Sequence, residues 1–344
     1  MATITVDADG YRIDRGPEIT STCPLAAAIR AAEDLTTDRE GVTIVVVGQV
    51  LRGLDVGGPS GYQNKDNCGY WRKRPIERLT IQGNGERSAI GPLRFWDGLN
   101  GVDSITIKAL RIINEPNEFA PIRTAMNEVH GHITIEGCTI HGNGTNWNGL
   151  GMKWGVRGHG PAKWTIKDVF VEPAQEHSLY IDNPQGNTLI DRVTGGGNGR
   201  TFIQITNRPT SGPSQSGDIM VSNCLCRDIN DDGGGGSDYT FVGCVGTLTV
   251  KDCTSYNTTN GALVCWTDTH NGTYPIGDHL DYSFKNVVIQ NFTASSRRAS
   301  RPMIALSGVF VGKIIDAKID TPGIKYRLGG PYGGPRPNGN IEIV

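Results

Sequence analysis

A short pattern of alternating apolar residues recurs along most of the chain and constrains its fold more than any other feature. Nine segments begin with this pattern, and they are residues 79–81, 105–107, 133–135, 164–166, 188–190, 219–221, 248–250, 282–284 and 312–314. Aligned on their third residue, they follow one another at intervals of 24 to 34 residues. Intervals of this length are typical of stacked supersecondary units, because one such unit cannot bury its apolar face alone.

The repeated units read as strands and not as helices. Apolar residues alternate at period two, and no apolar stripe at the helical period of 3.6 residues accompanies them. The position three residues after the anchor is usually small and apolar, and Cys138, Cys224 and Cys253 fall in this column. A second strand follows about thirteen residues after the anchor, as in residues 178–182, 202–206 and 262–266. Each unit therefore contributes two or three strands to parallel sheets.

Coils of this kind, stacked from about residue 42 to 320, resemble the right-handed parallel β-helix of the pectate-lyase-like superfamily. The resemblance implies an all-β fold, a solenoid of about nine to eleven coils, and one domain over residues 1–344. Residues 1–41 are then an N-terminal cap, residues 42–320 the coils and residues 321–344 an irregular C-terminal cap. Glycine and proline are dense in this last segment, which favours irregular structure.

One amphipathic helix is predicted, over Pro24–Leu35, with Thr22 as its N-cap. It precedes the apolar strand predicted at residues 42–47. A helix at this point would cover the open first coil, where the core and the unpaired strand edges are otherwise exposed.

Composition excludes several other classes. The 344 residues include 47 glycines, which indicates many tight turns, while the 37% hydrophobic content argues against disorder. Formal net charge is −2, so we expect no nucleic-acid partner, and any cationic patch must be local. No run of about eighteen apolar residues occurs, so we expect no membrane partner. The first residues lack a secretory signal, yet we expect an extracellular or virion-associated protein and not a cytoplasmic one.

The cysteines of the repeat read as buried small residues. Cys226 falls in the next inward column after Cys224, and this pair lacks the two-residue gap of a zinc knuckle. Cys23 and Cys68 lie outside the repeat, and the sequence leaves open whether they are bridged.

Short motifs do not identify a family within the superfamily. The segment 158–160 (Gly-His-Gly) and the pair Asp231 and Asp232 are similar to motifs of polygalacturonase-like hydrolases, but their order is reversed and the Asn-Thr-Asp triplet is missing. The Arg-x-Pro-x-x-Arg and Trp-Ile-Asp-His signatures of classical pectate lyases are absent as well.

Polar side chains are expected to gather on the outward face of the second strand in each coil. If Leu179 and Ile181 face inward, then Tyr180 and Asp182 face outward. By the same alternation the outward column gains Gln204, Thr206 and Trp266, and in earlier coils Arg94, Trp96, Arg123, Asn127 and Lys153. Guanidinium groups suit carboxylates, aromatic faces suit pyranose rings, and amides suit hydroxyls. A polysaccharide, specifically an acidic glycan, is therefore the predicted partner.

The chemistry predicted for this face is β-elimination at a uronate. In that reaction a base removes the proton alpha to a carboxylate, and a cation stabilises the charge that develops. We predict His177 or Lys153 as the base, Tyr180 as the acid or a second base, and Arg200 with Arg208 as carboxylate clamps. Asp182 is open to three interpretations: a calcium ligand, a residue that orients another, or a turn residue. Calcium is the candidate metal at this residue, and the identity of the cofactor stays open.

Three other functions fit the same fold. Hydrolysis by inversion needs two carboxyl groups separated by about 6.5 to 9.5 Å, and Asp231, Asp232 and Asp238 are the alternative acids. Uronate epimerisation shares the proton abstraction of the lyase. A non-catalytic β-helix that binds glycans, such as an adhesin or a virion protein, is the alternative from outside enzymology.

Overall fold

The computed structural model is nearly all β, with long parallel sheets compatible with a β-helix solenoid. It describes residues 2–35, 41–56, 68–70, 77–95, 104–114, 120–124, 131–142, 152–158, 162–197, 199–207, 215–229, 237–259, 261–266, 283–297, 301–329 and 339–344. The chain forms two compact units, Met1–Glu172 and Pro173–Val344, and each is described by itself. Within the described residues no helix is long and apolar enough to span a bilayer.

Unit 1 holds the helix α1 (Pro24–Leu35), as predicted, and the first seventeen strands. The strands are β1 (Ala2–Val6), β2 (Gly10–Ile13), β3 (Ile19–Thr20), β4 (Val42–Val46), β5 (Gln49–Val50), β6 (Leu54–Val56), β7 (Cys68–Tyr70), β8 (Leu79–Gly83), β9 (Ala89–Ile90), β10 (Leu93–Phe95), β11 (Ser104–Lys108), β12 (Arg111–Ile113), β13 (Ile122–Thr124), β14 (His132–Glu136), β15 (Thr139–His141), β16 (Trp154–Gly158) and β17 (Lys163–Val171).

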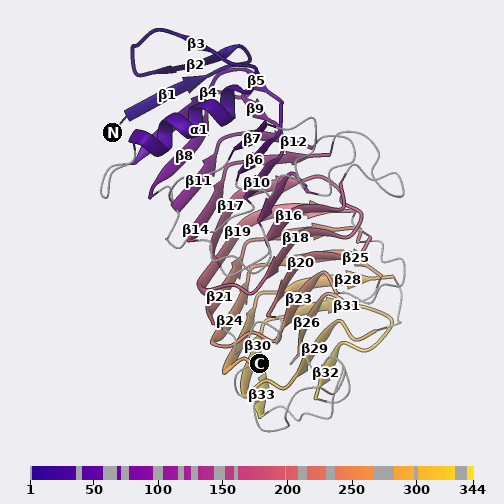
Figure 1. The fold of residues 1–344 in the computed structure, drawn as a ribbon. Coiled ribbons are helices and arrows are strands. Elements are labelled where there is room, and N and C mark those ends of the chain that lie inside the picture. Colours follow the sequence, from indigo (N-terminus) through magenta and orange to yellow (C-terminus); the bar gives the residue numbers. More distant parts are fainter. Residues whose placement is uncertain are drawn as a thin grey trace. The chain divides into compact units, whose positions relative to one another are not determined.

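Strands β2 and β3 extend β1 as antiparallel neighbours, and the other strands form three series of parallel neighbours (Figure 1). The first runs β1, β4, β8, β11, β14 and β17, the second β5, β9, β12, β15 and the end of β17, and the third β7, β6, β10, β13 and β16. In the first series Ile81 pairs with Ile107, Ile107 with Ile135, and Ile135 with Ile166. All four are fully buried, which confirms the predicted alignment in this unit.

A left-handed backbone residue turns the chain from the first series into the second. Ala109, Gly137 and Asp168 occupy this place in unit 1, each two residues after the anchor, with φ between 52° and 60°. Arg192, Asn223, Asp252, Asn291 and Asp316 recur with similar φ in unit 2. Glycine, asparagine and aspartate tolerate this conformation best, which explains the polar or glycine residue seen at this point of the repeat.

Unit 2 holds the remaining strands. They are β18 (His177–Asp182), β19 (Gly186–Gly196), β20 (Thr201–Thr206), β21 (Ser216–Ser222), β22 (Leu225–Arg227), β23 (Tyr239–Val242), β24 (Thr247–Lys251), β25 (Thr254–Thr258), β26 (Leu263–Trp266), β27 (Asn286–Gln290), β28 (Thr293–Ser296), β29 (Ile304–Ser307), β30 (Val311–Ile315), β31 (Lys318–Asp320), β32 (Tyr326–Leu328) and β33 (Asn340–Ile343). The predicted second strands match β18, β20 and β26.

Unit 2 repeats the three parallel series. They run β19, β21, β24, β27, β30 and β33; the end of β19, β22, β25, β28 and β31; and β18, β20, β23, β26, β29 and β32. One predicted anchor is wrong, since Val250 pairs with Ile289 and not with Phe284. The physical reason is the turn: the left-handed residue Asn291 follows Ile289 by two positions, as the fold requires.

Buried cysteines line the core as predicted. Cys138 is 2% exposed, Cys224 is 1% exposed, and Cys226 and Cys253 are fully buried. Burial raises the pKa of the Cys138 thiol to about 11. Cys23 is disulfide-bonded, while the Cys68 side chain lies outside the described part of the chain.

The two ends of the chain differ from the predicted caps in detail. The first helical hydrogen bond runs from the Ala27 N–H to the Cys23 carbonyl, so Cys23 and not Thr22 is the N-cap. Helix α1 packs against β1, β2 and β4, as expected of a cap. At the other end β32 and β33 continue the parallel series within the segment predicted to be irregular, so local regularity persists there.

Candidate functional site

Strand β18 is buried on both of its faces. Leu179 and Ile181 are fully buried in the core, as predicted. Tyr180 and Asp182 alternate with them and are 9% and 1% exposed. The expectation that this column forms open surface is therefore wrong for β18, because the face away from the core is covered as well.

Glu176 joins two of the predicted catalytic residues. Its carboxylate oxygens lie 3.4 Å from the Arg200 Nη1 atom and 3.8 Å from the His177 Nε2 atom. Its carbonyl accepts hydrogen bonds from the N–H groups of Arg200 and Thr201, at 3.1 and 2.9 Å. These bonds fix the chain immediately before β18 against the start of β20. Glu176 is not among the residues predicted from the sequence, although its place beside His177 was a usable signal.

Tyr180 completes this cluster of four residues. Its ring centroid lies 4.9 Å from that of His177, and the ring planes are tilted by 51°. The structure thus links Arg200 to Glu176, Glu176 to His177, and His177 to Tyr180. We call these four residues the Glu176 cluster.

Amide and hydroxyl groups follow on β20. The Gln204 Nε2 donates to the Thr206 Oγ1 at 3.1 Å, and these two residues pair with Tyr180 and Asp182 in the register. Asn207, directly after the strand, is 3% exposed, and its Nδ2 finds no hydrogen-bond partner among the residues that the structure describes. A buried donor left in this state costs about 1 to 3 kcal/mol, which a ligand oxygen would relieve.

Trp266 belongs to the same outward column as Asp182, further along the series. Thr206 pairs with Val242, and Val242 pairs with Trp266, which is partly exposed. The column therefore contains the predicted residues Asp182 and Trp266, separated by two strands.

Three arginines form a column of their own in unit 1. Arg94 pairs with Arg123, and Arg123 pairs with Arg157. Arg94 and Arg157 are each 5% exposed. The Arg157 guanidinium lies 4.6 Å from the Trp154 ring centroid, and the Lys153 Nζ lies 4.7 Å from it. Arg94, Arg123 and Lys153 were predicted here, whereas Arg157 and Trp154 were missed despite lying on an alternating strand.

Asp238 faces the core and not a surface. It is fully buried, and its carboxylate accepts hydrogen bonds from the hydroxyls of Ser255 and Thr258. Its charge also contributes to the raised pKa of the Cys226 thiol, after burial itself. This placement favours a structural role over that of an alternative acid. The other predicted residues Trp96, Asn127, Arg208, Asp231 and Asp232 lie outside the described residues.

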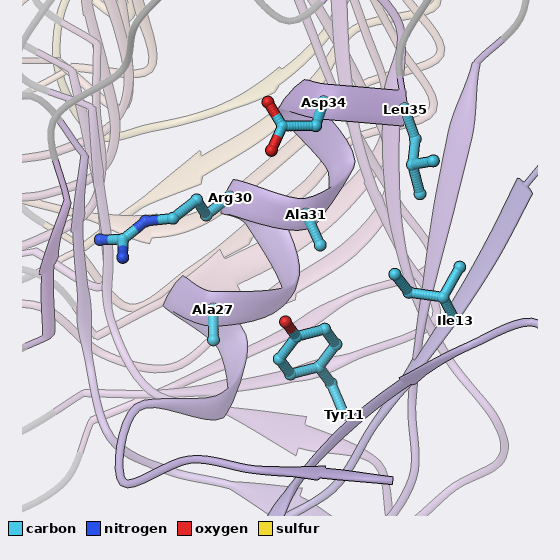
Figure 2. Close-up of a pocket in the computed structure, with 7 residues that line it drawn as sticks. All are labelled: Tyr11, Ile13, Ala27, Arg30, Ala31, Asp34 and Leu35. Carbon is cyan, nitrogen blue, oxygen red and sulfur yellow. The ribbon is translucent and has the colours of Figure 1, made fainter. Parts of the chain in front are cut away.

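A separate pocket lies in the N-terminal cap, between α1 and β2 (Figure 2). It has a volume of about 370 Å³, and its lining includes Tyr11, Ile13, Arg30 and Asp34. None of the residues predicted to act on a glycan lines it. Among the described residues, no group of three or more histidine, cysteine, aspartate or glutamate side chains is arranged to hold a metal ion.

Comparison with known proteins gives no match: no family model, no curated protein and no solved structure resembles the chain closely enough to be matched. The chemistry of the site is therefore argued from its own residues. In unit 2 the Glu176 cluster combines an imidazole, a phenol and a guanidinium, and in unit 1 the arginine column presents three cations in register with one another.

Proposed function

We propose that the protein is a right-handed parallel β-helix of the pectate-lyase-like superfamily and that it cleaves an acidic, uronate-containing glycan by β-elimination. The contact between His177 and Tyr180, beside the Arg200–Glu176 ion pair, is the observation that carries this proposal. One proton acceptor, one proton donor and one cation are the groups that this reaction needs.

In the proposed reaction the neutral His177 imidazole takes the proton alpha to the uronate carboxylate. The electron pair of that C–H bond forms the new carbon–carbon double bond, and the glycosidic carbon–oxygen bond at the beta position breaks. Tyr180 gives its phenolic proton to the leaving oxygen. Arg200 stabilises the charge that builds on the carboxylate while the proton is in transfer.

Glu176 acts as a positioning residue in this scheme. It holds the Arg200 guanidinium on one carboxylate oxygen and faces His177 with the other. Because the Arg200 side chain is 41% exposed, it retains access to a ligand while one edge is anchored. Lys153, predicted as an alternative base, is assigned to binding, since its ammonium lies over Trp154.

The arginine column supplies carboxylate recognition in unit 1. Parallel strands lie about 4.8 Å apart, so Arg94, Arg123 and Arg157 offer cations at a regular spacing. Guanidinium groups bind carboxylates with two parallel hydrogen bonds, and a polymer of uronates repeats its carboxylates along one line. This match favours an acidic polysaccharide over a small ligand.

The burial of His177 and Tyr180 favours a second candidate, a glycan-binding β-helix without chemistry, such as an extracellular adhesin or a virion protein. A hydrolase or a uronate epimerase uses the same fold and substrate class.

A screen of acidic polysaccharides separates these functions. Ultraviolet absorbance of an unsaturated product, lost in His177→Ala, is the expected result. New reducing ends without absorbance would select hydrolysis, a changed uronate configuration without cleavage would select epimerisation, and binding without any product would select the non-catalytic protein.

A further inference from the structure

A column of threonines runs across the outer face of the first strand series in unit 1. The column contains Thr3, Thr43, Thr80, Thr106, Thr134 and Thr165, each in register with the next. Their neighbours along each strand are buried, so the threonines lie on the face away from the core, and all six are partly exposed. At a strand spacing of about 4.8 Å, the column extends over roughly 24 Å.

Two polar columns flank the threonines. On one side Arg78 precedes β8, and Ser104, His132 and Lys163 follow in register at the starts of the next strands. On the other side the register aligns Gln82, Lys108, Glu136 and Lys167. The three columns together are called the threonine face below.

The threonine face is locally cationic in a chain of formal net charge −2. Arg78, Lys108, Lys163 and Lys167 stand against the single carboxylate of Glu136. Among the ion pairs between described residues, none involves these four cations. Their charge is therefore available to an anion from solution.

Sheet stability accounts for the threonines and for one flank. Threonine pairs and opposite charges on neighbouring strands both stabilise a sheet, and Glu136 lies between Lys108 and Lys167 in the register. It does not account for the other flank, where neither Arg78 nor Lys163 has a carboxylate beside it in the register. His132 lies beside Lys163 in the register, and its Nε2 is 2.9 Å from the Thr165 hydroxyl. In unit 2 the corresponding column contains Met220, Thr249, Val288 and Lys313, so this combination is confined to unit 1.

We propose that the threonine face anchors an acidic polysaccharide that lies along the threonine column, across the strands. Its carboxylates pair with the flanking lysines and Arg78, while its hydroxyls bond to the threonine hydroxyls. The choice of a uronate polymer rests on the proposed function, since it is the same substrate class. The anchor is separate in sequence and in residues from the Glu176 cluster and from the arginine column.

The test measures binding of immobilised alginate, a polyuronate, and needs no turnover. The triple variant Lys108→Gln, Lys163→Gln, Lys167→Gln removes three cations from the face. The matched control Lys285→Gln, Lys318→Gln, Lys325→Gln removes three exposed lysines from unit 2. We expect the first triple to weaken binding at least about tenfold and the control by less than about twofold, with unchanged melting temperatures.

A second variant separates the threonine hydroxyls from general electrostatics. Thr106→Val with Thr134→Val keeps shape and charge, and we expect it to weaken alginate binding by about threefold or more. Equal weakening by the two lysine triples, or no effect of the valine pair, would overturn the anchor. Tighter binding of DNA than of alginate at matched salt would show that the threonine face prefers a nucleic acid to an acidic glycan.

The experiments distinguish a failure of the proposed anchor from a failure of the proposed function. If the protein binds alginate through the threonine face but turns over no polysaccharide, the proposed lyase activity is wrong and the proposed anchor stands. If the protein turns over a polysaccharide and the Lys108, Lys163 and Lys167 variant binds alginate as the wild type does, only the proposed anchor is wrong.

Discussion

The His177 and Tyr180 rings lie with their centroids 4.9 Å apart and their planes tilted by 51°. Both side chains are at least nine-tenths buried, so packing restricts their rotamers. In the proposed reaction these two rings are the proton acceptor and the proton donor, and they are positioned before a substrate binds, which favours catalysis by orientation.

Tyr180→Phe tests the donor while it keeps the ring contact. We expect turnover to fall roughly a hundredfold, because a proton-transfer group is lost, with little change in substrate affinity or melting temperature. The measurement is the initial rate of unsaturated product together with a thermal melt. Tyr326→Phe, on β32 of the same unit, is the matched control and should retain full turnover. Unchanged turnover in Tyr180→Phe would place the chemistry on other residues.

Arg200→Ala tests the cation of the same cluster. The variant removes the partner of Glu176 and, in the proposed reaction, the group that stabilises charge on the substrate carboxylate. We expect kcat/KM to fall by more than kcat, because ground-state binding of the carboxylate is lost along with transition-state stabilisation. Steady-state kinetics over a range of substrate concentrations measures both. A fall in kcat alone would contradict the assignment as a clamp.

Core positions were predictable from the sequence because burial fixes the register of every strand. Ile81, Ile107 and Ile135 repeat an inward position that a shift of one residue would turn outward. The same logic failed at Phe284, where a similar alternation precedes the true strand β27. Only the pairing of Val250 with Ile289 resolves the choice.

The site was less predictable, because it depends on contacts between segments. The sequence placed His177 and Tyr180 on one strand, but the bridge through Glu176 to Arg200 depends on how the chain enters β18 and β20. Likewise, alternation predicted which face Tyr180 occupies. It carried no information on what covers that face.

Ile190→Asp tests the core of unit 2. Ile190 is fully buried and pairs with Val221 on the next strand, so a carboxylate there would be unpaired between strands. We expect a loss of about 3 kcal/mol or more, seen as unfolding or insolubility. Met220→Asp, on an adjacent strand at a residue 46% exposed, should stay within about 0.5 kcal/mol of the wild type in urea unfolding. If the Ile190→Asp variant is soluble and unfolds cooperatively, Ile190 is not a core residue.

Thiol labelling tests the inward cysteine column. Burial is the main cause of the raised pKa of Cys224, and at Cys138 it raises the pKa to about 11, so little thiolate forms at neutral pH. We expect no labelling of these residues in hours in the native protein and complete labelling in denaturant, followed by mass spectrometry of peptides. Rapid modification of Cys224 or Cys253 in the native protein would contradict the inward orientation of this column.

His132 predicts how stability depends on pH. Burial, and secondarily the Lys163 charge, lower its pKa from the ordinary value of 6.5. The unfolded chain then binds a proton at a pH at which the folded chain does not, so unfolding becomes easier as pH falls through 6.5 toward the lower folded value. Between pH 8 and pH 5.5 the free energy of unfolding, measured in urea, should fall by less in His132→Gln than in the wild type. Lys163→Gln should also reduce the loss, since it removes the repulsion, whereas Lys167→Gln removes an equal charge that does not act on His132 and should leave the loss unchanged. If His132→Gln loses as much stability as the wild type, other groups set the pH dependence.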